Sequence, residues 1–381
     1  MTHRALAPGS RSRGVPIPGY APKSRLSSSH APSYAEPSRF RREASITVPR
    51  PVMIVSLAIA LVSVLPTAEA QQASVRAYHV GVLHPAFGER TPALEGLRAG
   101  LKAAGLEEGR DVVFDVKFTR GDVHALPAAA KALMAGGVDV IFTVGEAPTR
   151  AAMAATGTAS IVFAGVGDPV AAGIVKATAH PGGNVTGVSG LETELAPKRL
   201  EILKALVPSL RRVWAVHHVD DPSAAAAARG AQEAAPRLGV QVIARPVRTA
   251  KELAETLKGI PHGDGLLAPY DTILDVPGQM LVASLWARLP VIYPAAFWTR
   301  AKLPGVAESG LGGLAAYGSD YEAEGVQAAR LVAKILRGQT PRDLPVEDVT
   351  QVRLIINLKT ARALGLMIPS SVLARADEII E

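Results

Sequence analysis

Motifs that could carry chemistry are few in this sequence, and each one found is incomplete. The run Gly165-Val166-Gly167-Asp168-Pro169-Val170 begins like the glycine-rich loop of a dinucleotide site, but its third glycine is absent and Pro169 interrupts it. His217 and His218 are adjacent, so in a strand they would point to opposite faces and make a poor pair of metal ligands. Neither motif predicts a cofactor or a metal.

Signatures of catalysis are also absent from the sequence. Neighbouring carboxylates, as at Glu192 and Glu194, are more typical of a solvated face than of an acid–base pair. The sequence holds no Walker loop, no GxSxG nucleophile elbow and no HExxH zinc motif, and with no cysteine it has no thiol chemistry. We therefore expect a protein that is not an enzyme, with no catalytic residues, no metal and no cofactor.

Length, composition and charge place the chain among ordinary globular proteins. Its 381 residues are 48% hydrophobic, which suits two domains and is too apolar for a disordered chain. The net charge of +7 comes from residues 1–50, which carry nine basic and two acidic side chains. From Gln71 onward 32 basic residues face 31 acidic ones, a net charge of +1. Nucleic-acid binding therefore loses its main support, and we expect no such partner.

The first fifty residues predict a disordered leader. Residues 1–50 are basic, contain seven prolines and nine serines, and show no apolar periodicity. They are much longer than the usual start of a signal peptide, so we interpret them as sequence upstream of a true translation start near Val48. Arg41-Arg42 leaves a twin-arginine export route open beside the general secretory route.

Residues 51–70 predict a signal peptide. The uncharged run at 52–65 would extend roughly 21 Å as a helix, short of the ~30 Å hydrocarbon core, which disfavours the alternative of an uncleaved membrane anchor. Ala68 and Ala70 follow it as a small-residue cleavage site. Because no cysteine is present to carry a lipid, we expect a mature protein that begins after Ala70, lies in the periplasm and is not lipid-anchored.

Apolar strand-like runs alternate with helical patterns along the rest of the chain. Strands are predicted at 78–83, 112–118, 138–144, 160–164, 213–216, 240–243, 265–268 and 291–293, with helices between them. The pattern loosens over the Gly-rich segment 180–187 and then restarts. Near-continuous apolar strands between helices indicate parallel sheets that are covered on both faces. The sequence thus predicts an α/β protein with two runs of βα units.

A series of motifs, collinear from about residue 77 to 381, resembles one known family. They are Leu94-Glu95-Gly96-Leu97-Arg98-Ala99-Gly100-Leu101, Gly167-Asp168-Pro169-Val170-Ala171-Ala172-Gly173, His180-Pro181-Gly182-Gly183-Asn184-Val185-Thr186-Gly187-Val188, Lys198-Arg199-Leu200-Glu201-Ile202-Leu203, Pro290-Val291-Ile292-Tyr293-Pro294, Ala316-Tyr317-Gly318, Ile356-Asn357-Leu358-Lys359-Thr360-Ala361-Arg362-Ala363-Leu364-Gly365-Leu366 and Ala374-Arg375-Ala376-Asp377-Glu378. In this order they are similar to the ABC-transporter substrate-binding proteins that include tryptophan- and tyrosine-type binding proteins.

The resemblance implies a type I periplasmic-binding-protein fold, with two doubly wound parallel-sheet lobes joined by a three-crossover hinge. Lobe one would comprise 77–187 plus 319–340, and lobe two 188–318 plus 341–381. The crossings would lie near Gly187, Gly318 and Thr340, where glycine and turn residues can absorb a hinge rotation. It also implies a monomer that captures a small molecule, an amino acid or similar, and delivers it to the transmembrane subunits of an ABC permease with their ATPase.

The ligand site is expected at the carboxyl ends of the strands, where helix N-termini present free N–H groups. The candidate ligand-binding residues are His84, Phe87, Gly145, Glu146, Ala147, Asp168, His218, Asp220, Tyr270, Asp271, Tyr293, Phe297 and Tyr317. A ligand carboxylate could lie against the N–H groups at Glu146 and Ala147, and an ammonium could pair with Asp271 or Asp168. The aromatic rings could enclose an apolar or ring-bearing side chain.

Some candidates have plainer alternatives. Asp168 could cap the following helix, Tyr293 could be a core residue, and His84 could be a solvated loop histidine. Glu146 departs from the hydroxyl residue found in many relatives, and a glutamate there would repel a ligand carboxylate and favour a cationic or neutral polar ligand. Sequence around His217 and His218 also departs from the Asn-Pro-rich pattern of many relatives.

Two other classes of protein share this scaffold. An exported α/β enzyme acting on a small metabolite is the main alternative, and the missing catalytic constellation argues against it. A transcriptional regulator would need an N-terminal helix-turn-helix, which the Pro/Ser-rich leader and apolar run do not supply.

Overall fold

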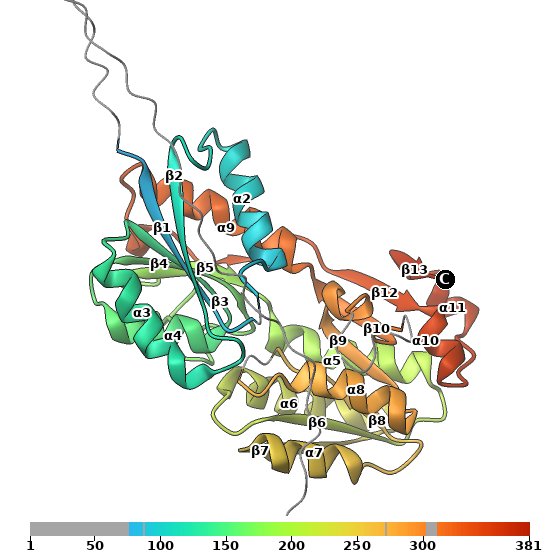
Figure 1. Cartoon of the computed structure of the whole chain (residues 1–381). Coiled ribbons are helices and arrows are strands. Elements are labelled where there is room, and N and C mark those ends of the chain that lie inside the picture. The colour runs from blue at the N-terminus through green and yellow to red at the C-terminus, as the bar shows by residue number, and fades with distance from the viewer. Residues whose placement is uncertain (1–75, 87, 271–272, 302–310) are drawn as a thin grey trace, which may run out of the picture. The chain divides into compact units, whose positions relative to one another are not determined.

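Two β-sheets, each covered by helices on both faces, organise the chain (Figure 1). The computed structural model describes residues 76–381, apart from 87, 271–272 and 302–310. The predicted leader and signal peptide lie outside the described residues. Among the described helices, none is both long enough and apolar enough to cross a membrane.

The first sheet has six strands in the order β11-β5-β4-β3-β1-β2, and its paired strands run parallel. Its strands are β1 (Tyr78–His84), β2 (Val112–Phe118), β3 (Val140–Val144), β4 (Ser160–Val166), β5 (Val185–Ser189) and β11 (Glu347–Asp348). The central strands are apolar along their length because both faces of the sheet are buried. We call this sheet and its helices lobe one.

Helices cover the two faces of the first sheet. They are α2 (Pro92–Ala103), α3 (Leu126–Ala135), α4 (Glu146–Ala155) and α9 (Tyr321–Leu336). Helices α2 and α9 lie side by side over one face although they are far apart in the sequence (Figure 1). They approach so closely that a Cβ atom on Gly325 would lie 2.0 Å from the carbonyl oxygen of Ala93. This contact fixes the returning helix α9 to lobe one.

The second sheet has seven strands in the order β13-β12-β10-β9-β8-β6-β7. Its strands are β6 (Arg212–His218), β7 (Gln241–Val247), β8 (Gly265–Leu267), β9 (Val291–Ala295), β10 (Ala315–Ser319), β12 (Arg353–Asn357) and β13 (Glu378–Ile380). Strands β10 and β12 pair antiparallel, whereas the other pairs are parallel. Strands β10 and β12 are therefore an antiparallel exception in a sheet that is otherwise parallel, as the sequence predicted. We call this sheet and its helices lobe two.

Three of the described helices of lobe two begin at polar side-chain caps that the sequence supplies. The helices are α5 (Glu192–Leu206), α6 (Pro222–Ala234), α7 (Ala250–Lys258), α8 (Val276–Ala287), α10 (Leu358–Ala363) and α11 (Ser370–Leu373). The side chains of Asp221, Thr249 and Asn357 each accept a hydrogen bond from a backbone N–H in the first turn of the following helix. Short 3₁₀ helices are η1 (Val123–Ala125), η2 (Ala235–Leu238), η3 (Ala296–Thr299) and η5 (Pro341–Asp343).

The chain crosses between the sheets three times. It leaves lobe one after β5, returns to it after β10 to form α9, and leaves again after β11 at residues 349–352. The last crossing lies further along the chain than the expected position near Thr340, because Glu347 and Asp348 pair with Val188 and Ser189. Strand β5 lies within the segment where the sequence pattern loosens, and it was not predicted.

Candidate functional site

A cavity of about 700 Å³ opens where residues of both lobes meet. Loops that follow β1 to β4 and the first residues of α2 and α9 contribute from lobe one, and the segments around β8, α8 and η3 contribute from lobe two. Its position at the carboxyl ends of the strands is the one that parallel sheets predict. The lining residues are His84, Pro85, Ala86, Gly88, Arg90, Thr91, Pro92, Ala93, Arg120, Gly121, Val144, Gly145, Gly165, Ala250, Tyr270, Ile273, Leu274, Asp275, Gln279, Phe297, Trp298 and Tyr321.

Two glycines form the part of the wall that β3 and β4 supply. Gly145 has a φ of 97° and Gly165 a φ of 67°, values that side-chain-bearing residues rarely adopt. The Gly145 amide donates to the carbonyl of Ala164 over 2.8 Å, which ties the two strand ends together. The absence of side chains lets the backbone itself face the cavity here.

Aromatic rings form the opposite wall. Phe297 and Trp298, both on η3, meet edge to face with centroids 5.2 Å apart, and Tyr270 meets Tyr321 in the same way at 5.7 Å. Phe297 also lies 6.1 Å from Tyr321, so the four rings are continuous. Rings arranged in this manner offer a large apolar surface with polar tips at the tyrosines.

A buried carboxylate connects this aromatic wall to lobe one. Glu324 on α9 accepts hydrogen bonds from the hydroxyls of Tyr270 and Ser319 on one oxygen, and from the Gly165 amide, at 2.7 Å, on the other. Burial raises the pKa of Glu324, and burial also raises the pKa of Tyr270, so the phenol keeps the proton that it donates. Glu324 therefore holds Tyr270 against the cavity.

His84 ends β1 as a buried neutral base, which excludes the solvated-loop alternative for this residue. Its ring stacks on Phe118 with centroids 6.0 Å apart. Burial lowers the pKa of His84, and Nε2 lies 3.0 Å from the carbonyl oxygen of Glu89. Because a carbonyl only accepts, Nε2 carries the proton and Nδ1 is an acceptor, which has no partner among the described residues.

Four of the predicted site residues line the cavity: His84, Gly145, Tyr270 and Phe297. Phe87 and Asp271 lie outside the described residues. The other seven are not among the lining residues: Glu146, Ala147, Asp168, His218, Asp220, Tyr293 and Tyr317. Contact of any of these residues with a ligand stays a prediction.

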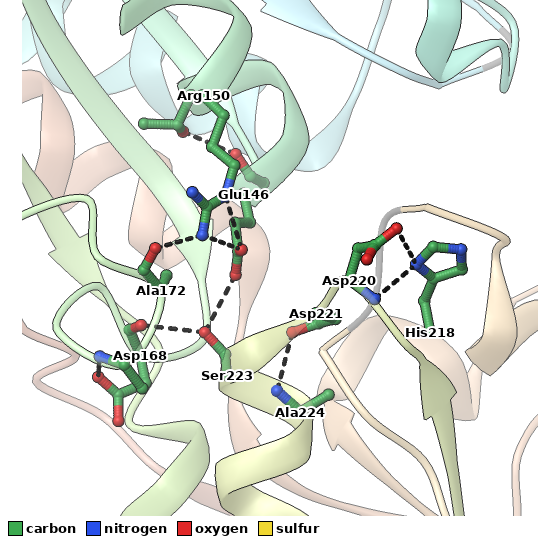
Figure 2. Close-up of polar contacts among 12 residues, drawn as sticks. Glu146, Arg150, Asp168, Ala172, His218, Asp220, Asp221, Ser223 and Ala224 are labelled. Carbon is green, nitrogen blue, oxygen red and sulfur yellow. Dashed lines mark hydrogen bonds and ion pairs between the residues drawn. The ribbon is translucent and has the colours of Figure 1, made fainter. Parts of the chain in front are cut away.

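Glu146 and Asp168 belong to a contact between the two lobes instead of lining the cavity (Figure 2). Glu146 Oε1 accepts from Arg150 Nε at 2.9 Å, in an ion pair within α4. The Ser223 hydroxyl, on α6 of lobe two, lies 3.1 Å from Glu146 Oε2 and 2.9 Å from the Asp168 carbonyl. Its single proton serves one of these acceptors at a time.

The Asp168 side chain caps the residues that follow it, as the plainer alternative predicted, although these residues form a turn and not the expected helix. Its Oδ1 accepts from the amides of Val170, at 3.1 Å, and Ala171, at 2.9 Å. Its Oδ2 accepts from the Thr193 hydroxyl at 2.6 Å. Both oxygens of the Asp168 carboxylate therefore already accept hydrogen bonds from the protein.

His218 and Asp220 lie at the end of β6 (Figure 2). His218 Nδ1 accepts from the Asp220 amide at 3.1 Å, while the Asp220 side chain is 78% exposed. In the described part of the chain, no cluster of three or more His, Asp or Glu side chains could hold a metal.

Tyr293 and Tyr317 lie away from the cavity lining. Tyr293 is fully buried and stacks on Trp298 with centroids 5.9 Å apart, which matches the core alternative. Tyr317 packs against the core of lobe two, and its carbonyl accepts from Arg199 Nε at 3.0 Å.

Lining residues that the sequence analysis missed include Arg120, Asp275, Trp298 and Tyr321. Signals for three of them were present. Arg120 follows the carboxyl end of β2, which is one of the predicted strands. Trp298 adjoins the predicted Phe297, and Tyr321 begins the helix after β10.

The family follows from a comparison with known proteins. A family model described as "ABC transporter substrate binding protein" matches residues 78–380. The chain belongs to this family. The match confirms the predicted resemblance, and it gives no support to the alternative of an exported enzyme.

Relatives of this substrate-binding protein agree with that assignment. A tyrosine-binding protein of Clostridioides difficile is 27% identical over 289 residues, which cover 75% of this chain and 79% of that protein. A solved domain protein from Vibrio cholerae is 30% identical with a TM-score of 0.68, covering 80% of this chain and all of the other. An ABC domain in complex with L-Trp from Streptococcus pneumonia is 26% identical with the same TM-score and coverage. These neighbours confirm the type I periplasmic binding fold.

Proposed function

We propose that this substrate-binding protein is exported to the periplasm and binds an amino acid with an apolar or aromatic side chain, for delivery to an ABC permease. The ligand occupies the cavity between the lobes. Its contacts with both lobes stabilise the closed form, which is the form that the permease recognises. The protein acts as a monomer and breaks no bond.

The aromatic wall is the observation that carries the amino-acid proposal. Tyr270, Phe297, Trp298 and Tyr321 together line the cavity, and glycines and apolar side chains make up most of the rest of its lining, beside charged or polar residues such as Arg90 and Arg120. Such a wall suits a side chain that carries a ring or a branched apolar group. Two relatives, a tyrosine-binding protein and an ABC domain in complex with L-Trp, are consistent with this preference.

The expectation of a cationic or neutral polar ligand rested on Glu146. That carboxylate is paired with Arg150 and is not among the lining residues, so its charge is compensated away from the cavity. Charged residues that do line the cavity include Arg120 and Asp275, which carry opposite signs. A zwitterionic amino acid fits this balance better than a cation does.

Export is tested by expressing the full-length chain in a Gram-negative bacterium and sequencing the N-terminus of the periplasmic product. We expect a protein that begins at Gln71. A product that stays with the membrane or keeps residues 51–70 would contradict the signal-peptide proposal. Sedimentation of the purified product tests the monomer.

Ligand class is tested by a thermal-shift screen of that product. The panel comprises L-tryptophan, L-tyrosine, L-phenylalanine and L-leucine, with sugars, polyamines, nucleosides and small dicarboxylates as competing classes. A ligand at 100 times its dissociation constant stabilises by about 2.7 kcal/mol, which raises the Tm by several degrees. A hit confined to sugars or polyamines would overturn the amino-acid proposal. Native mass spectrometry of the same sample detects a ligand carried through purification.

Tryptophan fluorescence places the ligand. Trp298 lines the cavity, whereas Trp286 on α8 is 80% exposed and does not. We expect Trp298→Phe to abolish the ligand-induced fluorescence change and Trp286→Phe to preserve it. A response that follows Trp286 would place the ligand elsewhere.

A further inference from the structure

The two arginines that line the cavity differ in whether a carboxylate of the protein forms an ion pair with them. Arg90 forms a two-pronged ion pair with Glu95, with Nε to Oε1 at 3.0 Å and Nη2 to Oε2 at 2.8 Å. Arg120 also lines the cavity, and no described carboxylate lies within ion-pair distance of it. Lobe one therefore presents one uncompensated positive charge to the ligand space.

We propose that Arg120 is the anchor for the carboxylate of the bound amino acid. This inference rests on the proposed function, because it needs an amino-acid ligand. A guanidinium presents a planar set of N–H donors that matches a carboxylate in a two-pronged geometry. Arg120 thereby sets specificity for a free carboxylate over an amide or an amine.

The backbone at Arg120 is held in an unfavourable conformation at this position. Its φ is 54°, in the left-handed region that favours glycine. The Arg120 amide donates to the carbonyl of Ala86 at 3.2 Å, and the Gly121 amide donates to that of Pro85 at 2.6 Å. Both acceptors also line the cavity. Backbone strain that the surrounding structure maintains is concentrated at functional sites.

An aromatic ring limits the positions of the Arg120 guanidinium. Its Cζ lies 5.8 Å from the centroid of the Phe118 ring, and the other neighbour of that ring is His84. A cation–π contact of this kind restrains a long side chain without using its N–H donors. Arg120 can then meet a carboxylate with less loss of side-chain freedom than an unrestrained arginine.

The helix N-terminus that the sequence suggested as the carboxylate anchor is a weaker candidate. Glu146 occupies the first position of α4 and brings its own negative charge there. Neither Glu146 nor Ala147 is among the lining residues. Asp275, at the start of α8 in lobe two, also lines the cavity, so side chains of both charge signs are present in its lining.

Calorimetric titration with L-tryptophan, L-tyrosine, L-tryptophanamide and tryptamine tests the anchor. We expect Arg120→Gln to weaken binding of L-tryptophan or L-tyrosine by about 10- to 100-fold, the range for a lost charge-assisted hydrogen bond. Binding of the amide and the amine, which lack the carboxylate, should change by less than about 3-fold on the same reasoning. Arg110→Gln, at an arginine that is ion-paired with Asp111 and is not among the lining residues, should leave all four affinities unchanged.

Arg120→Gly separates ligand binding from a structural role. Glycine relieves the left-handed strain, so this variant should unfold at an equal or higher Tm while losing affinity for the carboxylate ligands. A variant that loses stability and binds all four probes equally poorly overturns the anchor. So does an Arg120→Gln protein that binds L-tryptophan like the wild type. A wild-type protein that binds neither amino acid, and no other on the panel, overturns the proposed function and the anchor with it.

Discussion

Replacing Glu324 with leucine removes the acceptor on which three buried donors converge. The Gly165 amide lies 2.7 Å from Oε2, and the hydroxyls of Tyr270 and Ser319 both bond to Oε1. Glu324 is 1% exposed, so water cannot take the place of its carboxylate without a rearrangement. These donors come from both lobes and from the end of β10. The substitution therefore tests how much the hydrogen bonds to Glu324 stabilise the fold.

The magnitude follows from counting the donors left without a partner. The hydroxyls of Tyr270 and Ser319 are 2.9 Å apart and can bond to each other, which leaves the Gly165 amide and one hydroxyl unsatisfied. Each unsatisfied buried donor costs about 1–3 kcal/mol, and relief of the buried carboxylate offsets part of this. We expect a net loss of about 2–4 kcal/mol in the free energy of unfolding, or about 5–15 °C in Tm.

Glu324→Gln is the matched control. Its amide oxygen can accept from Gly165 while its NH₂ group donates to the two hydroxyl oxygens, so we expect a loss below about 1 kcal/mol. Urea unfolding followed by circular dichroism compares the two variants with the wild type. If the leucine and glutamine variants were equally stable, the argument from converging donors would be refuted.

The pH dependence of unfolding stability, compared between the wild type and Glu324→Gln, gives a second readout. Burial raises the pKa of Glu324 above its ordinary value of 4.5. The folded state therefore binds this proton more tightly than the unfolded state, so its contribution to stability is complete below about pH 4.5 and is lost as the pH rises through the raised pKa. The glutamine variant does not titrate there. The stability of the wild type relative to Glu324→Gln should fall from pH 4 to 8, and a constant difference would exclude the shift.

Three further substitutions test the packing, the lobe contact and the charge argument. Gly325→Ala should cost about 1–3 kcal/mol in thermal unfolding because its Cβ would meet the Ala93 carbonyl at 2.0 Å, whereas Gly157→Ala, with open space around it, should cost little. Ser223→Ala removes a hydrogen bond between the lobes worth about 1 kcal/mol, so ligand affinity by calorimetry should fall about 5-fold; an unchanged affinity would show that closure does not use it. Glu146→Gln should alter the preference for L-tryptophan over its amide by less than about 3-fold, and a larger change would return Glu146 to the site.

Most of the fold could be predicted because its strands are buried on both faces and read as apolar runs. Strand β2 lies where the sequence placed it, at Val112–Phe118, and helix α3 (Leu126–Ala135) lies between two predicted strands, where a helix was expected. Strand β5 was missed because Thr186 and Gly187 interrupt its apolar pattern. Gly187 is required by a tertiary contact, since a Cβ there would lie 2.4 Å from the Phe163 carbonyl oxygen. The pairing of β11 with β5 joins segments that are distant in sequence, and no local sequence pattern predicts it.

The site was predicted in part because the strand-end rule locates a region without deciding which side chains face it. His84 and Tyr270 do face the cavity. Asp168 lies at a strand end equally well, but nearby amides and the Thr193 hydroxyl take up its oxygens. Hydrogen bonds formed within two or three residues of a side chain compete with a ligand for it, and only the folded geometry shows which of them form.

The charge that a ligand meets depends on pairing, which the order of residues does not reveal. In the sequence Glu146 is the conspicuous charge near a predicted strand end, and Arg120 is one arginine among many. In the structure Arg150 compensates Glu146, Glu95 compensates Arg90, and no described carboxylate compensates Arg120. Under the proposed anchor, lobe one therefore prefers a negative ligand group, whereas Glu146 in the sequence had suggested a cationic or neutral polar ligand. A charged residue in a cavity is therefore informative about the ligand when no oppositely charged side chain of the protein pairs with it.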